Sequence, residues 1–139
     1  MKGGVKRAND STDSSKVVRF TDFRWSGVEP REYKDPNDRW RDVTRHPLIG
    51  VDEGTPFHLR YFEVQPGGHT TFEQHLHEHV VVAIRGSGEV RLGDRWETVA
   101  FGDVVYVAPR EPHQFRAADD EPFGFLCIVE AERDRPVAL

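Results

Sequence analysis

The sequence has very little cysteine: Cys127 is the only one among 139 residues. An intrachain disulfide is therefore impossible, which fits a reducing compartment, and we expect a cytoplasmic protein. Long apolar runs are also missing, since the runs reach only five residues, as in VVVAI (80–84). Such runs are too short to span a bilayer. No apolar stretch follows the basic residues near the N-terminus, so we expect no secretory signal.

An excess of basic residues is absent as well. The chain has 19 Lys and Arg against 24 Asp and Glu, a formal net charge of −5. Residues 1–16 carry +2, from four basic and two acidic side chains, which leaves −7 for the rest of the chain. An acidic body argues against a nucleic acid or a membrane surface as partner. No Gly-rich phosphate loop stands before a predicted helix either.

The length predicts one domain with two less regular ends. Residues 1–16 are small, polar and charged, and we expect a flexible tail. Residues 17–56 contain large aromatic residues and prolines without helical periodicity, which predicts an N-terminal arm with short strands that packs on the main body or on a partner subunit. An irregular surface wrap would explain the same pattern. Residues 131–139 are expected to form a C-terminal tail.

Short β-type runs fill residues 57–130. They are rich in Val, Phe, Tyr and Ile, and Gly or Pro turns separate them, which predicts an all-β sandwich or barrel. Gly93 and Asp94 should form a tight two-residue hairpin. The expected strands are FHLRYFEV (57–64), TTFEQH (70–75), HVVVAI (79–84), GEVRL (88–92), RWETV (95–99), DVVYVA (103–108), HQFRA (113–117) and FGFLCIVE (123–130).

One stretch, FEQHLHEHVVV, concentrates groups that bind metals. Glu73, His75, His77 and His79 occupy alternate positions, so they share one face if the strand stays regular. Imidazole nitrogen and carboxylate oxygen together suit a transition-metal ion. A solvent-facing polar stripe would explain one or two of these residues, but three histidines before an apolar run less well. His113, 34 residues after His79, could complete the coordination.

These motifs resemble those of the cupin superfamily over residues 57–130. The pattern PGG, E-x-H-x3-H and G-x-G, then G-D and P-x-x-P-H, carries the resemblance. It implies a cupin-type double-stranded β-helix (jelly-roll) barrel, here with an N-terminal arm, and a metal inside. It also implies the ligands Glu73, His75, His79 and His113. Glu replaces the usual first His and His the usual Glu, an arrangement similar to that of manganese cupins such as ureidoglycine aminohydrolase.

An alternative register would use His75 and His77 as the His-x-His pair of the motif. The acidic ligand would then fall at residues 81–82, which are both valine. We therefore place His77 at the rim or just behind the ligands, and it would be next in line if Glu73 turned away. In the second motif, Ala108 and Arg110 stand where the family commonly has Pro and Gly.

Five residues on predicted strands are candidates for the wall of a substrate cavity. An inward-facing Arg60 or Arg85 would favour a substrate that carries a carboxylate. Cys127 would line the cavity if alternate residues of its strand face inward, and is otherwise a small core residue. The candidates are Arg60, Phe72, Arg85, Phe115 and Cys127. No catalytic residue can be named beyond the metal ligands.

We expect one divalent transition metal per chain, with manganese or iron favoured and zinc or nickel as alternatives. Metal binding should weaken below about pH 6 as the histidines take up protons. The leading interpretation is an Fe/Mn dioxygenase-type oxidoreductase that acts on a small organic molecule. A non-redox isomerase, lyase or aminohydrolase and a non-catalytic small-molecule-binding protein are the alternatives. Small members of this superfamily usually pair, so we expect a homodimer.

Overall fold

The computed structural model describes residues 14–33 and 39–139 and contains only strands and connections there. The predicted N-terminal tail lies outside these residues except for positions 14–16. The all-β jelly-roll prediction is confirmed. The strands are β1 (Phe20–Thr21), β2 (Arg24–Trp25), β3 (Arg31–Glu32), β4 (Arg41–Ile49), β5 (Phe57–His69), β6 (Glu73–Gln74), β7 (His79–Arg85), β8 (Ser87–Leu92), β9 (Arg95–Ala100), β10 (Val104–Val107), β11 (His113–Ala117), β12 (Phe123–Glu130) and β13 (Val137–Ala138).

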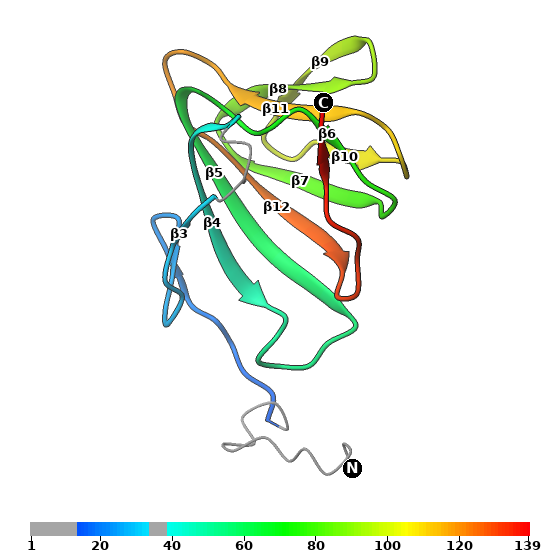
Figure 1. The fold of residues 1–139 in the computed structure, drawn as a ribbon. Helices are drawn as coiled ribbons and strands as arrows, with labels where there is room; N and C mark the ends of the chain where they lie inside the picture. Colours follow the sequence, from blue (N-terminus) through cyan, green and yellow to red (C-terminus); the bar gives the residue numbers. More distant parts are fainter. Residues whose placement is uncertain (1–13, 34–38) are drawn as a thin grey trace.

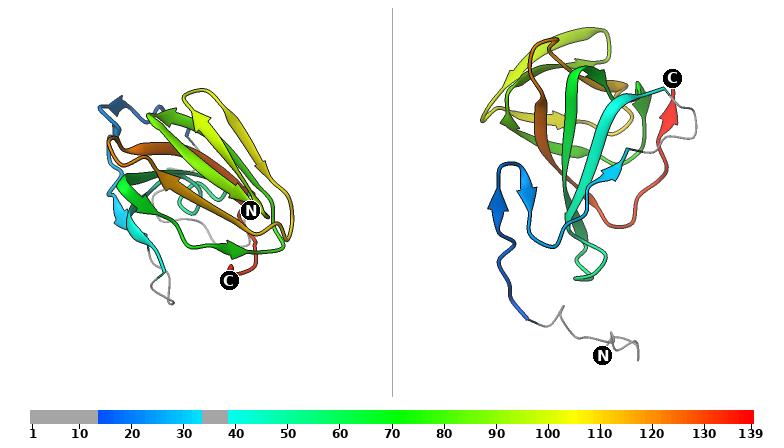
Figure 2. Two further views of the ribbon diagram at one scale, coloured as in Figure 1. Left: turned by 90° about the horizontal axis from the view of Figure 1, so that it is seen from above. Right: turned by 90° about the vertical axis from the view of Figure 1, so that its left-hand side faces the viewer.

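Two curved sheets face each other across a common interior (Figures 1 and 2). One sheet has the order β10-β7-β12-β5-β4-β3, and the other has β9-β8-β11-β6-β13. The long strand β5 links them, because its last residue, His69, pairs with Arg116 of β11. All of these pairings are antiparallel. The interior between the sheets is where an enclosed site can form.

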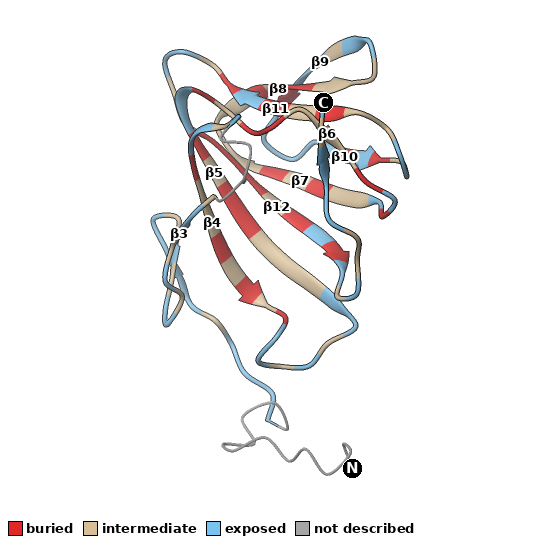
Figure 3. Cartoon of the chain, in the orientation of Figure 1, coloured by how far each residue is buried: buried red, intermediate tan, exposed pale blue. Residues whose placement is uncertain are grey.

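Buried and less buried residues alternate along the long strands (Figure 3), because successive side chains point to opposite faces and one face looks into this interior. In β12, Phe123, Phe125, Cys127 and Val129 are buried, whereas Ile128 between them is 38% exposed. The same alternation buries the inward residues of β7, β8 and β11. The main core therefore consists of apolar side chains between the sheets.

The region predicted as an N-terminal arm contributes to the main sheet. Its strand β4 pairs with β5 over most of its length, so the sheet begins before residue 57. The hairpin β1–β2 packs on the outer side of β5, where the Trp25 ring lies 4.9 Å from the ring of Tyr61. Tyr61 is fully buried as a result. At the other end of the chain, β13 pairs with β6, so residues 131–139 run back across the molecule.

Two glycines make turns that other residues would strain. Gly93 has φ +63° in the two-residue turn that joins Leu92 to its partner Arg95, as the sequence predicts. Gly86 has φ +61°, and a Cβ there would lie 2.2 Å from the carbonyl oxygen of Pro122. Gly86 therefore lets β7 turn into β8 against the start of β12.

No helix in residues 14–33 or 39–139 is long and apolar enough to cross a membrane. The outer face of β10 exposes Val104 and Tyr106, at 65% and 60%. Cross-strand register places these residues opposite Val82 and Val80 of β7, which gives this face an apolar strip. The homodimer stays a prediction.

Truncation of a core residue of β12 should destabilise the barrel. Phe123 is 0% exposed, so Phe123→Ala should lower the free energy of unfolding by about 3–5 kcal/mol. Phe101 is 74% exposed, and Phe101→Ala should change it by less than about 0.5 kcal/mol. Urea denaturation of both variants measures this. Equal losses would contradict the assignment of Phe123 to the core.

Candidate metal centre

Four of the five predicted metal-site residues, all except His113, come from residues 73–79, which do not form one regular strand. The predicted strand over residues 70–75 is reduced to β6, which carries Glu73, and the backbone bends after it. His75 and His77 lie in this bend, and His79 opens β7. The backbone amides of Leu76 and His77 donate to the Asp134 carboxylate at 2.8 and 3.2 Å, instead of to a neighbouring strand. The bend thus replaces regular strand alternation.

The structure brings three histidines and a glutamate together from both motifs. One ligand atom each from His75, His79 and His113 lies within 4.8 Å of the others. The Nε2 atoms of His75 and His113 are 3.1 Å apart, and Glu73 Oε2 lies 4.0 and 3.9 Å from them. Two ligands of one ion at about 2.1 Å are about 3 Å apart at right angles and about 4.2 Å apart when opposite. The spacing fits one shared ion, and the ligation itself stays a prediction.

Backbone carbonyls determine which nitrogen of each ring carries the proton. His75 Nδ1 lies 2.6 Å from the His77 carbonyl oxygen, and His113 Nδ1 lies 2.8 Å from that of Glu111. Because a carbonyl oxygen can only accept, both Nδ1 atoms donate and both Nε2 atoms keep a lone pair. Two lone pairs at 3.1 Å repel each other, and a cation between them would remove that repulsion. The donor set therefore fits a metal ion.

His77 lies closer to the other histidines than a rim position requires. Its Nε2 atom is 3.3 Å from Nε2 of His79, and its Nδ1 donates to Asp134 Oδ1 at 2.8 Å. Hydrogen bonds from Leu76 N, His77 Nδ1 and His77 N lower the pKa of Asp134 to about 2, so this acceptor is ionised. The carboxylate aims His77 at the cluster, as carboxylates do behind metal-binding histidines.

Burial opposes protonation of His75, His79 and His113. It lowers the pKa of His75 to about 4, with His113 and His77 adding to the effect. The pKa values of His79 and His113 are lowered as well, in both cases chiefly by burial. Neutral imidazole is the form that coordinates metals. The expected weakening of metal binding below about pH 6 therefore moves to a lower pH, because these rings take up protons later than free histidine does.

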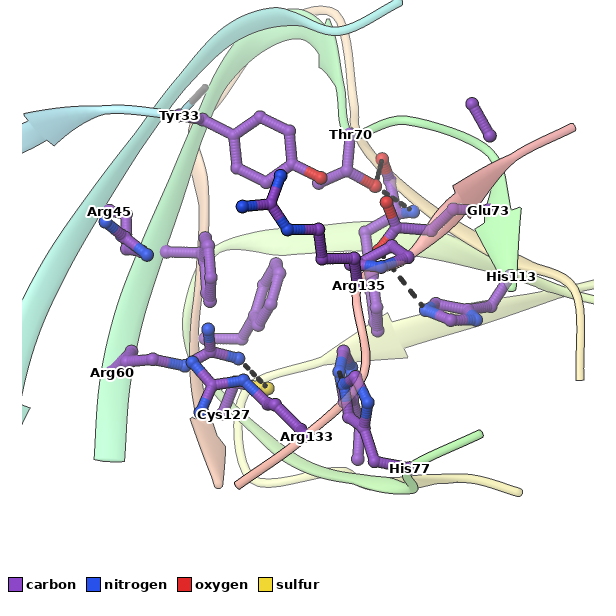
Figure 4. Close-up of a pocket in the computed structure, with 16 residues that line it drawn as sticks. Tyr33, Arg45, Arg60, Thr70, Glu73, His77, His113, Cys127, Arg133 and Arg135 are labelled. Atoms are coloured by element: carbon purple, nitrogen blue, oxygen red, sulfur yellow. Dashed lines mark hydrogen bonds and ion pairs between the residues drawn. The ribbon is translucent and has the colours of Figure 1, made fainter. Parts of the chain in front are cut away.

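A pocket of about 600 Å³ opens beside the cluster (Figure 4). This volume suits a small organic ligand. Phe62, Phe115 and Phe125 give the pocket an aromatic wall. The centre of the Phe125 ring lies 5.5 Å from that of Phe62 and 4.5 Å from that of Phe115. The lining residues are Tyr33, Arg45, Arg60, Phe62, Thr70, Glu73, His77, His79, His113, Phe115, Phe125, Cys127, Arg133, Arg135, Pro136 and Ala138.

Three of the five predicted cavity residues line this pocket: Arg60, Phe115 and Cys127. Cys127 and Arg60 are opposite each other on β12 and β5, and an Arg60 N–H group donates to Sγ of Cys127 at 3.3 Å. Burial raises the pKa of the Cys127 thiol, although Arg60 opposes this. The thiol is therefore protonated near neutral pH.

The other two candidates, Phe72 and Arg85, are not among the residues that line this pocket, and their role in substrate binding stays a prediction. Arg85 ends β7, pairs with Glu63 at 2.7 Å and covers the ring of Phe23, which belongs to the hairpin on the outer side of β5. Phe72 precedes β6 and packs under the guanidinium of Arg91, 4.1 Å away. Both side chains make contacts outside the cavity. Arg85 lies at the register shift between β7 and β12, and Phe72 precedes Glu73, which does line the pocket.

Sequence reasoning missed the polar residues from the two ends of the chain. Arg45 of β4 reaches the pocket, and Arg133 and Arg135 reach it from the segment after β12, the C-terminal strap (residues 131–139). The strap was predicted as a C-terminal tail. The alternation Arg133-Asp134-Arg135 is the one sequence feature that could have indicated these pocket residues. In an extended segment the two arginines point to one side and the aspartate to the other.

The loop before His113 is attached to the bend that carries His75. Arg110 N donates to the His75 carbonyl oxygen at 2.7 Å. Arg110 has φ +67°, a conformation that favours glycine, which the resemblance led us to expect here. The backbone turn therefore forms without glycine, at a cost of about 1 kcal/mol. This contact joins the two motifs independently of any metal.

Substitution of the clustered histidines should remove the metal. We expect His75→Ala, His79→Ala and His113→Ala each to lower metal affinity by at least about tenfold, because each removes a ligand. His77→Ala should cost less, and His69→Ala, outside the cluster, should leave metal content unchanged. Elemental analysis of the purified variants measures this. Equal losses for His75→Ala and His77→Ala would show that the register of the first motif is wrong.

The metal-free protein should lose stability as the pH falls from 6.5 towards 4. In this range the unfolded chain binds protons at its histidines, while the folded state, with the pKa of His75 near 4, does not. Stability from the buried neutral ring is thus complete above pH 6.5 and lost below it. Urea midpoints at pH 7, 6 and 5 should fall, and His75→Gln should make the fall shallower. An unchanged slope in His75→Gln would contradict this.

Known proteins share both the fold and these motifs. A model of the cupin domain family matches residues 60–129. The chain is 43% identical over 130 residues, 92% of its length and 83% of the relative's, to 1-methylthio-D-xylulose 5-phosphate methylsulfurylase of Rhodospirillum rubrum. It is 29% identical over 88 residues, 63% of its length and 30% of the relative's, to (S)-ureidoglycine aminohydrolase of Arabidopsis thaliana.

The solved structures agree with these relatives. A cupin 2 conserved barrel domain protein from Rhodopseudomonas palustris superposes with a TM-score of 0.80 at 40% identity, over 89% of this chain and 86% of that one. The matched family region contains Glu73, His75, His79 and His113 together with most of the barrel strands. The chain therefore belongs to the cupin family.

Proposed function

We propose that the chain is a metal-dependent enzyme that removes the methylthio group from a small sugar derivative, as a methylsulfurylase. The observation that carries this is the cluster of His75, His79 and His113 beside a pocket of about 600 Å³. The identity of 43% to the Rhodospirillum rubrum methylsulfurylase, over most of both chains, supports the choice of substrate. One divalent transition metal per chain, with manganese or iron favoured and zinc or nickel possible, is part of the proposal.

A bound divalent ion would supply a Lewis acid for an oxygen atom of the substrate. The chain's own residues account for binding and orientation. Phe62, Phe115 and Phe125 offer an apolar wall that suits a methylthio group and excludes water. Cys127 adds a protonated thiol to the same wall, beside the Arg60 guanidinium.

An Fe/Mn dioxygenase is the second candidate. The set of imidazole nitrogens with one carboxylate, in an aromatic cavity, suits an ion that binds O₂ as well as one that only polarises a carbonyl. The name of the 43% identical relative favours the first candidate. The name of the aminohydrolase relative, at lower identity, agrees with a non-redox role for the ion.

Turnover of 1-methylthio-D-xylulose 5-phosphate tests the proposal. The wild-type chain is loaded in turn with manganese, iron, zinc and nickel. Its turnover should decrease the S-methyl signal of the substrate in proton NMR. The assay is run with and without an added small thiol, because replacing the C–S bond by a C–H bond requires two electrons. The thiol R′SH can supply them and the hydrogen, and the methylthio group then leaves as the mixed disulfide R′S–SCH3. We expect His113→Ala to be at least about a hundredfold slower and His69→Ala to match the wild type.

Two outcomes would contradict the methylsulfurylase proposal. One is an unchanged S-methyl signal under every metal and thiol condition. The other is consumption that requires O₂ and takes up O₂ in proportion, which would favour the dioxygenase. Anaerobic and aerobic reactions run side by side separate the two.

A further inference from the structure

Four arginines converge on the pocket from three parts of the chain: Arg45 from β4, Arg60 from β5, and Arg133 and Arg135 from the C-terminal strap. We call them the arginine cluster. In the part of the chain that the structure describes, none of the four forms an ion pair. Other arginines do so, as Arg85 does with Glu63 at 2.7 Å.

The positive charges repel one another. Burial lowers the pKa of Arg133, and Arg60 and Arg45 lower it further. Burial likewise lowers the pKa of Arg45, and the charges of Arg60 and Arg31 lower it further. Like charges gathered in a half-buried wall cost free energy unless a counter-ion joins them. The folded chain therefore holds an excess of positive charge at this wall.

The neighbouring groups do not neutralise it. The Arg60 N–H group that contacts Cys127 Sγ meets a protonated thiol, because burial raises the pKa of that thiol. The Nε atom of Arg60 is buried and has no hydrogen-bond partner. Among the described residues that line the pocket, Glu73 is the only acidic one, and it lies at the histidine cluster. Donors in the wall thus remain for a ligand.

The strap holds part of the cluster in place. Arg133 donates to the carbonyl oxygen of Glu130 at 2.7 Å, which fixes its guanidinium. Asp134 points the other way and accepts from His77 Nδ1 at 2.8 Å. Figure 4 shows Arg60 and Arg133 beside Cys127, across the pocket from His77 and His113. Arg60 and Arg133 therefore lie at one end of the pocket and the histidine cluster at the other.

We propose that the arginine cluster binds the phosphate group of the substrate and leaves its other end at the histidine cluster. This inference rests on the proposed function in one respect, that the same pocket is the active site. A phosphate monoester is a dianion with three acceptor oxygens, and guanidinium forks bind it in pairs. A carboxylate, the anion expected from the sequence, brings one charge and two oxygens to four arginines.

Binding of inorganic phosphate tests the inference without turnover. Calorimetric titration uses the metal-loaded chain and the chain treated with a chelator, at constant ionic strength. Arg45→Gln and Arg135→Gln are the first variants. Neither side chain forms a hydrogen bond or ion pair with another described residue, so the substitutions remove no such contact. Each should weaken phosphate binding by about tenfold. Arg95→Gln is the matched control, since Arg95 is exposed and pairs with Glu97 on β9.

The inference predicts that phosphate binds with or without metal, more tightly than acetate, and that Arg95→Gln binds as the wild type does. It is overturned if phosphate does not bind, if acetate binds more tightly, if chelation alone abolishes binding, or if both cluster variants bind normally. Failure of the proposed function is recognised separately. A chain that binds phosphate through the arginines but leaves the methylthio sugar unchanged refutes only the activity, whereas turnover with an unchanged KM in Arg45→Gln refutes only the phosphate site.

Discussion

The site depends on two imidazole nitrogens that the backbone leaves facing each other without a proton between them. The carbonyls of His77 and Glu111 accept from Nδ1 of His75 and His113, so both Nε2 lone pairs meet at 3.1 Å. Burial opposes protonation of His75, His79 and His113. A protein that holds such atoms together favours a cation at that point, because nothing else in the described cluster removes the repulsion.

A second constraint is the division of charge within one small barrel. The chain as a whole is acidic, with a formal net charge of −5, yet one wall of its pocket gathers four arginines. The aromatic rings of Phe62, Phe115 and Phe125 lie between the inner surfaces of both sheets. A metal-binding end, an apolar wall and a positive end in one cavity can orient a small molecule by three different kinds of contact.

The C-terminal strap connects these ends. Its β13 pairs with β6, the strand of Glu73, and Asp134 holds the bend that carries His77. The same short segment supplies Arg133 and Arg135 to the positive wall. A change in the position of the strap would therefore be felt at both ends of the pocket. Composition alone hides this, since a short terminal segment with a run of charged residues looks like a tail until its partners are known.

The sequence by itself determined the strands between residues 79 and 130, the two histidine motifs and the family, because period-two patterning and turn residues act locally. The bounds of β11 and β12 and the hairpin at Gly93 follow from it directly. Only the tertiary structure decided which side chains share the cavity. Bulges and a bend at residues 75–78 break the alternation, so Arg85 faces outward while Arg45 and the strap arginines face the pocket. Facing depends on pairing between distant strands, and no local pattern encodes that pairing.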